Sequence, residues 1–507
     1  MGREVITLQL GGFANYVGAH FWNFQDELLG LQEREEPRNP ANQIDLSTVY
    51  RAGETLQGDA TYTPRLVLLD QKGSLGGIGA RGTLYLDAGV EAAAQAGITT
   101  WGGRAEVHRS HPVPRSRFMQ QLEEEAEGEE IEPERDAASA LDPALPSLLD
   151  TAAQELDAAG GVSYFTDFLK AHLHPRSIHQ LEGVWAGVTE FGGWGDGSGL
   201  GGSWQETREG LGEAVRFFAE ECDSLQGFQC LIDDLSGFGQ LAADALQELR
   251  DEYGTRPVLL FAVRPSAAVP DASLSPAEAR RHVLSNGLSH AVLSQRCDSY
   301  VALAPPRLHD GLHALRWQEG NLFHASAILA AAVDSATLPY RLDGGLGSAG
   351  GLVARETYVE SLVLRGPQQG DKGAMPLSAA ASALDAALVR EAIRCVRQRT
   401  LSSQPLPIPL PYPHIFRPEV SVFGVPGRTL RPAAASVTSC PTLTRLAGTA
   451  AFKPAVQVLM RDFRRTAGTA QGQAALDGWG YSREELVEIH EQLAHLAAAY
   501  DEGVEAF

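Results

Sequence analysis

The order of apolar and polar residues predicts an α/β protein that begins with a buried strand. Residues 4–10 (EVITLQL) form the first mainly apolar run, and after two glycines a helix-like pattern continues through Trp22. Arg65–Leu69 is a second strand candidate and ends at Asp70, while residues 257–263 (PVLLFAV) are a third. Strands that alternate with helices indicate a parallel sheet with right-handed crossovers.

The segment from Glu221 to Tyr253 is the most informative part of the chain. It predicts a strand with apolar residues between Leu225 and Ile232, a turn at Ser236–Gly239, and a helix. The apolar residues of that helix recur at helical spacing, and they are Leu241, Ala242, Ala245, Leu246 and Leu249. A helix that follows a glycine turn often binds phosphate, because its free N–H groups and its positive dipole end face the ligand.

The charge next to this turn argues against a phosphate. Asp233 and Asp234 stand on its entry side, and two carboxylates would repel an anion. The alternative interpretation is a tight strand-to-helix turn in which an aspartate acts as a local cap. The two interpretations stay open on these residues alone.

Further helices are predicted along the second half of the chain and near its middle. Residues 276–294 and 323–335 have helical patterns, and so does a short run in which Tyr164, Phe165, Phe168 and Leu169 share one face. The last helix begins at Ser482, with Glu485 in the capping-box position. Its apolar seam comprises Leu486, Ile489, Leu493, Leu496 and Tyr500. We expect this seam to pack onto the body of the protein, with a partner-binding helix as the alternative.

Three segments are predicted to lack regular structure. Gln121–Asp136 is dense in glutamate, which indicates a solvated, flexible insertion or, alternatively, a tail for a basic partner. Gly192–Gly202 contains seven glycines in eleven residues and is expected to form neither helix nor strand. Residues 402–418 carry proline at every second position from Pro405 to Pro413, which predicts an extended connector or an edge segment.

Length and charge restrict the class of protein. A chain of 507 residues is long enough for two or three domains. Its net charge of −23 argues against non-specific nucleic-acid binding and against adsorption to anionic lipid. No apolar run reaches the roughly 18 to 20 residues of a membrane span, and no secretory signal is visible. The five cysteines form no CxxC pair, so we expect neither zinc nor disulfides, and a reducing, cytosolic compartment.

Several short segments resemble tubulins. Residues 9–22 (QLGGFANYVGAHFW) resemble the first nucleotide loop and helix, and residues 62–70 (YTPRLVLLD) the strand that leads to the second loop. Residues 222–229 and 286–300 resemble the strand before the tubulin glycine signature and the helix after it.

The chain is more similar to the Misato family, which comprises divergent eukaryotic relatives of tubulin. The similar segments are residues 168–177 (FLKAHLHPRS), 221–229 (ECDSLQGFQ), 338–342 (LPYRL), 363–366 (VLRG) and 411–414 (PYPH). They keep their order over nearly the whole chain, so the resemblance covers both halves of the protein.

This resemblance implies a tubulin-like three-layer α/β fold. It predicts a tubulin-like N-terminal domain over residues 1–300, with a parallel sheet of the nucleotide-binding type and an acidic flexible insertion at about 120–160. A second, intermediate α+β domain is expected over residues 301–450, which include the proline-rich segment 402–418, and a C-terminal helical region over residues 451–507.

The resemblance also implies a cellular role. The family is linked to mitochondrial distribution, morphology and fusion, so the expected location is the cytoplasm and the cytosolic face of the mitochondrial outer membrane. Protein partners at that membrane are expected, with tubulin or its chaperonin as further partners and the spindle as a second location. Nucleic acid is not an expected partner, and attachment to the membrane would be peripheral.

The nucleotide loops of tubulins are kept only in part. Tubulins carry three glycines followed by Thr-Gly-Ser-Gly, whereas residues 233–239 here are DDLSGFG. Gly12, Ala14 and Lys72 replace a glutamine, a glycine and a metal-associated glutamate, and Gly192–Gly202 matches a third phosphate loop or is a surface linker. The candidate residues of this degenerate nucleotide cleft are Gly11, Asn15, Asp70, Ser236, Gly237 and Gly239. If the cleft is filled, we expect Phe13, Leu235 and Phe238 to fill it.

No catalytic or metal site is predicted. The resemblance aligns Ala327–Ala332 with the tubulin segment that supplies an acidic catalytic residue to the next subunit, and no side chain there can polarise water. The histidines at 172, 174 and 179 lack the spacing of four of a helical metal site. The leading hypothesis is a non-enzymatic factor without a cofactor. The alternative is a GTP-binding switch with little or no hydrolysis, and we expect no tubulin-like filament.

Overall fold

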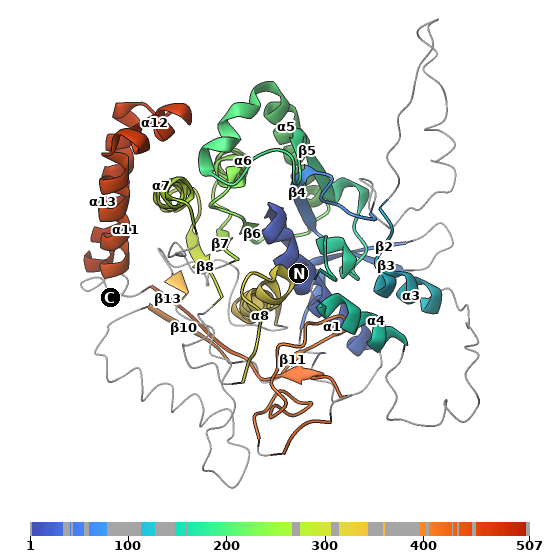
Figure 1. The fold of residues 1–507 in the computed structure, drawn as a ribbon. Coiled ribbons are helices and arrows are strands. Elements are labelled where there is room, and N and C mark those ends of the chain that lie inside the picture. Colours follow the sequence, from blue (N-terminus) through green and yellow to red (C-terminus); the bar gives the residue numbers. More distant parts are fainter. Residues whose placement is uncertain are drawn as a thin grey trace, which may run out of the picture.

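A six-stranded parallel sheet runs through the middle of the protein (Figure 1). Its strands are β1 (Val5–Leu10), β4 (Leu66–Lys72), β5 (Ile178–Trp185), β6 (Gly227–Ile232), β7 (Val258–Val263) and β8 (Ser299–Leu303). Their spatial order is β5-β4-β1-β6-β7-β8, and every neighbouring pair is parallel. The chain therefore runs outward from β1 in one direction and then continues on the other side of β1 at β6. Ligands of such doubly wound sheets bind where this reversal occurs, beyond the carboxyl ends of the strands.

The computed structural model describes the larger part of the chain. The described residues are 3–33, 41, 44–54, 60–78, 113–126, 148–158, 160–265, 274–305, 314–342, 358–359, 396–401, 405–427, 429–432, 435–448 and 453–502.

Helices cover both faces of the sheet (Figure 1). On one face, α1 (Gly12–Glu33) and α8 (Leu322–Arg341) pack over strand residues that include Leu68 and Phe261. On the other face lie α5 (Gly201–Glu220), α6 (Gly237–Tyr253) and α7 (Pro276–Leu293), over residues that include Val67 and Leu260. Neighbouring residues of a strand point to opposite faces, which separates the two cores. The predicted three-layer α/β fold is confirmed.

The C-terminal helices extend the second core. They are α11 (Lys453–Ala467), α12 (Ala470–Gly478) and α13 (Arg483–Glu502), and α11 and α13 pack against α7. Phe463, Ile489 and Leu493 are buried in this core. Ser482 and Glu485 form the predicted capping box, because each backbone N–H donates to the side chain of the other residue. The seam of the last helix from Leu486 to Leu496 therefore packs onto the body of the protein, as expected, and the side chain of Tyr500 lies outside the described residues.

The remaining elements are short. The helices are α3 (Arg117–Ala126) and α4 (Leu148–Asp157), and the 3-10 helices are η2 (Leu46–Thr48), η4 (Phe165–Asp167), η5 (Pro175–Ser177) and η6 (Trp194–Leu200). Two strand pairs are β2 (Tyr50–Glu54) with β3 (Ala60–Pro64) and β11 (Leu406–Pro407) with β12 (Ser439–Cys440), and a further sheet contains β10 (Val396–Leu401), β13 (Leu443–Gly448) and β9 (Tyr358–Val359).

The glycine-rich segment is helical, and the prediction that it cannot form a helix is wrong. Residues 194–200 form η6, and α5 starts at Gly201. The Asp196 carboxylate accepts the N–H of Gly193 at 2.8 Å and pairs with Arg281 at 2.6 Å. These contacts, with the burial of Trp194, offset the entropy that the glycines lose.

The C-terminal helices hold this same segment in place. The indole N–H of Trp194 donates to the Tyr481 hydroxyl at 2.8 Å. A Cβ atom added to Gly195 would lie 1.8 Å from Cγ of Trp479, so the indole ring packs directly on the glycine backbone. Residues almost 300 positions apart in sequence therefore fix η6 together.

The predicted helical face at Tyr164–Leu169 is also wrong, because only the three residues of η4 are helical. The Asp167 carboxylate accepts the N–H groups of Ser163 and Tyr164, each at 2.8 Å, and so stabilises a single turn. Phe165, Phe168 and Leu169 are buried all the same. The apolar pattern therefore identified buried residues but not their secondary structure.

The predicted flexible insertion at about 120–160 is helical at both ends. α3 continues to Ala126 and has Phe118 buried, and α4 begins at Leu148 and has Leu156 buried. Residues 127–147 lie outside the described residues. The proline-rich segment forms an edge through β11, and Leu406 and Ile415 in it are buried. The domain boundaries stay predictions.

One described helix, α8, has the length and apolar composition of a membrane span. In the fold it is a core helix, because 89% of its apolar stretch is buried and its neighbours include α1, β10 and β13.

Candidate functional site

The predicted cleft residues lie at the carboxyl ends of β1, β4 and β6. Gly11 follows β1 with a φ of +112°, and its N–H donates to Leu69 O at 3.0 Å. The Asp70 carboxylate accepts from Asn15 Nδ2 at 2.8 Å, which joins β4 to the start of α1. The turn after β6 leads into α6 at Gly237. The fold therefore places the predicted residues at the edge where doubly wound sheets bind ligands.

The first N–H groups of α6 are already bonded within the protein. Gly237 N–H donates to Phe191 O at 3.1 Å, and Gly239 N–H donates to Ser236 O at 3.0 Å. Phe238 N–H donates to Ser236 Oγ at 3.3 Å, so Ser236, and not an aspartate, caps the helix. A phosphate at a helix N-terminus needs such donors. Three of them are occupied here.

Protein atoms also fill the space next to the turn glycines. A Cβ atom on Gly237 would lie 2.5 Å from the Phe191 ring, and one on Gly239 would lie 2.8 Å from the Trp194 ring. A Cβ atom on Gly11 would lie 2.5 Å from Asp233 Cβ and 3.1 Å from the Phe238 ring. Aromatic rings and an aspartate therefore occupy the space that these glycines leave free, whereas in a phosphate loop the phosphate occupies it.

The side chains that fill this space were predicted in part. Phe238 is one of them, as expected, and is 3% exposed. Phe13 packs instead into the core beneath α1, and Leu235 is only half-buried. Phe191 and Trp194 take their places, and sequence reasoning missed both. Their position in and beside the glycine-rich segment is the signal that could have identified them.

The two aspartates of the turn have different roles. Asp234 is fully buried, and Arg264 contacts both of its oxygens, Nε at 3.1 Å and Nη2 at 2.6 Å. The hydroxyls of Ser289 and Tyr300 also donate to it, at 2.5 and 2.9 Å. Burial opposes its ionisation, but Arg264 holds the pKa of Asp234 below its ordinary value. The expectation that both carboxylates repel a phosphate is therefore wrong for Asp234.

Asp233 and Asp70 carry the remaining acidity of the site. Burial, with the nearby charges of Asp234 and Asp70, raises the pKa of Asp233 to about 7. Burial raises the pKa of Asp70 to about 6, although hydrogen bonds from Asn15 and the Gln71 N–H favour its ionised form. Both carboxyls are therefore partly protonated near neutral pH.

Other polar groups near the cleft are engaged elsewhere or unsuited to a metal. Lys72 pairs with Glu182 and lies over the Trp185 ring, so its ammonium does not contact the turn. In the part of the chain that the structure describes, no group of three or more His, Cys, Asp or Glu side chains is arranged to hold a metal. His174 stacks on Phe217, and His179 bonds to the Arg176 carbonyl.

Comparison with known proteins agrees with this architecture. Residues 3–124 match the family model described as the Misato Segment II tubulin-like domain, and residues 154–342 match a tubulin domain. The human protein misato homolog 1 is 29% identical over 99% of this chain and 98% of its own length. The chain belongs to the Misato family. This confirms the resemblance inferred from short segments.

Two further relatives are similar to this chain over a smaller share of its length. Protein misato of Drosophila melanogaster is 30% identical over 67% of this chain and 60% of its own length. Protein DML1 of Gibberella zeae is 28% identical over 72% of this chain and 66% of its own length.

The structure corrects one inference drawn from the resemblance of this Misato-family chain to tubulins. Residues 327–332 lie inside α8, and every one of them is buried. A residue that is supplied to a neighbouring subunit must be on the surface, so this segment is not the counterpart of the tubulin catalytic segment. The expectation of a non-enzymatic protein therefore depends on the occupied turn and not on this alignment.

Proposed function

We propose that this protein is a non-enzymatic, tubulin-related factor that acts through protein partners in mitochondrial distribution, morphology and fusion. It would act in the cytoplasm and on the cytosolic face of the mitochondrial outer membrane, with spindle microtubules as a second place of action. Its family membership supports this role. The occupied N-terminus of α6 is the observation that supports the absence of nucleotide chemistry.

The physical reason is that phosphate binding would require breaking existing contacts. A nucleotide would have to displace the Phe191 carbonyl and the Ser236 oxygens from the first N–H groups of α6. It would also have to move the Phe191 and Trp194 rings, which are 7% and 1% exposed. Burial of each such ring stabilises the fold by about 1.5–3 kcal/mol. This stabilisation would be lost on phosphate binding.

Equilibrium binding of a fluorescent GTP analogue, with and without magnesium, tests this proposal. We expect no saturable binding at micromolar protein and no release of phosphate over hours. Tight, saturable binding that Asp70→Ala abolishes and that the exposed-site variant Asp223→Ala retains would contradict it. Protease protection of the tagged chain on isolated mitochondria tests the location, and we expect full digestion without detergent.

The second candidate function is a GTP-binding switch with little or no hydrolysis. The bond between Asn15 and Asp70, next to the N-terminus of α1, favours it, since it keeps two tubulin-like cleft residues in contact. In this case Phe191 and Trp194 would have to move on binding. Phe191→Ala would then strengthen GTP binding in the same assay, whereas a protein without a nucleotide site would only lose stability.

A further inference from the structure

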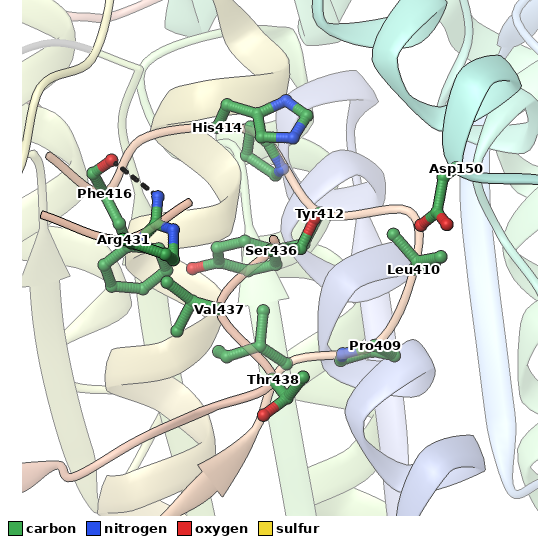
Figure 2. Close-up of a pocket in the computed structure, with 12 residues that line it drawn as sticks. Asp150, Pro409, Leu410, Tyr412, His414, Phe416, Arg431, Ser436, Val437 and Thr438 are labelled. Atoms are coloured by element: carbon green, nitrogen blue, oxygen red, sulfur yellow. Dashed lines mark hydrogen bonds between the residues drawn. The ribbon is translucent and has the colours of Figure 1, made fainter. Parts of the chain in front are cut away.

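A cavity of about 260 Å³ lies between α4, residues 408–416, Arg431 and residues 436–438, and it shares no residue with the predicted nucleotide cleft (Figure 2). An apolar cavity of about 150 Å³ is large enough to bind benzene. This cavity is therefore large enough for one aromatic ring with a short polar substituent.

The apolar wall of the cavity is held in a fixed shape. The Tyr412 and Phe416 rings stack at 6.0 Å between centroids with an interplanar angle of 22°. The Tyr412 hydroxyl donates to the Ala327 carbonyl of α8 at 3.3 Å, which fixes the ring against the core. Pro409 and Pro413 restrict the backbone of the same wall. Little conformational entropy would be lost when a flat apolar group binds here.

Arg431 gives the cavity a positive end. Its Nη1 donates to Val420 O at 2.6 Å and its Nη2 to Phe416 O at 3.4 Å, which uses two of the five guanidinium N–H groups. Within the described residues no carboxylate lies at ion-pair distance from it. The chain has 64 acidic and 41 basic residues, so a shortage of acidic residues does not explain why Arg431 lacks such a partner.

The environment of Arg431 is unfavourable for a cation without a counterion. The side chain is half-buried, and burial lowers the pKa of its guanidinium. A desolvated cation is stabilised when an anion completes its hydrogen bonds, and a guanidinium matches a carboxylate in a bidentate geometry. The remaining N–H groups therefore favour a carboxylate ligand.

The opposite side of the cavity carries a carboxyl group. Figure 2 shows Asp150 of α4 across the cavity from Arg431, with Tyr412 between them. His414 on the same wall is turned toward Asp157, with Nδ1 at 3.4 Å from its carboxylate. A ligand with one carboxylate would therefore place that group at Arg431, away from Asp150.

We propose that this cavity binds a carboxylate that a short chain connects to an aromatic ring. The carboxylate pairs with Arg431, and the ring packs on Tyr412 and the prolines. Two sources have this chemistry: a small arylalkanoic acid, and the C-terminal phenylalanine of a partner chain.

Titration calorimetry of the full chain with 3-phenylpropionate tests the site, and the neutral 3-phenylpropionamide is the matched ligand. We expect saturable binding of the acid and at least tenfold weaker binding of the amide. Arg431→Gln should weaken binding of the acid by about tenfold to a hundredfold, as expected for the loss of charge-assisted hydrogen bonds. Arg417→Gln, an exposed arginine in the same loop, should have no effect. Equal binding of acid and amide would overturn the proposal.

A second variant separates binding from folding, because Arg431 also holds two carbonyl oxygens. Ser436→Leu keeps both bonds and fills the cavity, so we expect an unchanged circular dichroism spectrum and lost binding. If this variant binds the acid as the parent does, the proposal is wrong.

Peptides separate the two sources. A pentapeptide with a free C-terminal phenylalanine that binds tenfold more tightly than 3-phenylpropionate, and loses this on amidation, indicates a partner chain. Equal or weaker binding of the peptide indicates a small acid. If neither the acid nor the peptide binds at millimolar concentration, the site does not exist.

Discussion

Asp233→Asn should stabilise the protein at alkaline pH and have much less effect in acid. Burial raises the pKa of Asp233 from its ordinary value of 3.8 to about 7. Between these values the folded state binds more protons than the unfolded state, so the free energy of unfolding falls as the pH rises through this window. Asparagine cannot ionise, and the variant should lack this loss.

The size of the effect follows from the shift. About three pKa units at about 1.4 kcal/mol each give about 4 kcal/mol as an upper limit above pH 7. Because the side chain of Asp233 is partly exposed, solvent screens part of this, and we expect about 2 kcal/mol at pH 8. At pH 5 the gain should be below about 1 kcal/mol.

Urea unfolding followed by tryptophan fluorescence at pH 5, 6.5 and 8 measures this gain. Asp223→Asn, an exposed aspartate near the same strand, is the control and should give the same curve as the parent. A gain that is equal at pH 5 and pH 8, or smaller at pH 8, would refute the reasoning about a half-buried carboxyl group with a raised pKa.

Three further changes test the packing of the site. Arg264→Met leaves Asp234 buried without its cation and should lower the free energy of unfolding in urea by about 3–5 kcal/mol. The Asp234→Leu, Arg264→Met double variant should recover most of this loss. Equal losses in the single and the double variant would argue against a buried ion pair. Gly239→Ala places a methyl group 2.3 Å from Asp234 O and should lower stability by about 1–3 kcal/mol, which thermal unfolding detects; no change would mean that the turn relaxes freely. Burial lowers the pKa of His20 to about 3, so stability should fall by about 2 kcal/mol from pH 6.5 to 4.5 as the unfolded state gains the proton. His20→Phe should remove this slope, and a slope that persists would assign the acid sensitivity to another group.

The strands and most helices could be predicted because their causes are local. β1, β6 and β7 are apolar runs, and the helical spacing that begins near Leu241 continues to the end of α6. The capping box at Ser482 needs only residues three positions apart. Such patterns are complete within a few residues, so the sequence alone contains them.

The site could not be predicted in full because its contacts connect distant residues. Arg264, which compensates Asp234, is 30 positions away, and Arg281, which stabilises η6 through Asp196, is 85 positions away. Without these partners, the sequence pattern indicates an uncompensated charge at Asp234 and an irregular glycine-rich segment. Composition and spacing contain no information about which cation reaches which carboxylate.

The contact of η6 with Trp479 and Tyr481 has a consequence for synthesis of the protein. Chains begin to fold from their N-terminal end while the ribosome is still extending them. The residues that lock Trp194 and cover Gly195 are translated almost 300 codons after them. A nascent chain can therefore assemble β1, β4 and β6 early. Until translation is nearly complete, however, Trp194 and Gly195 lack their contacts with Tyr481 and Trp479, and aromatic rings stay exposed.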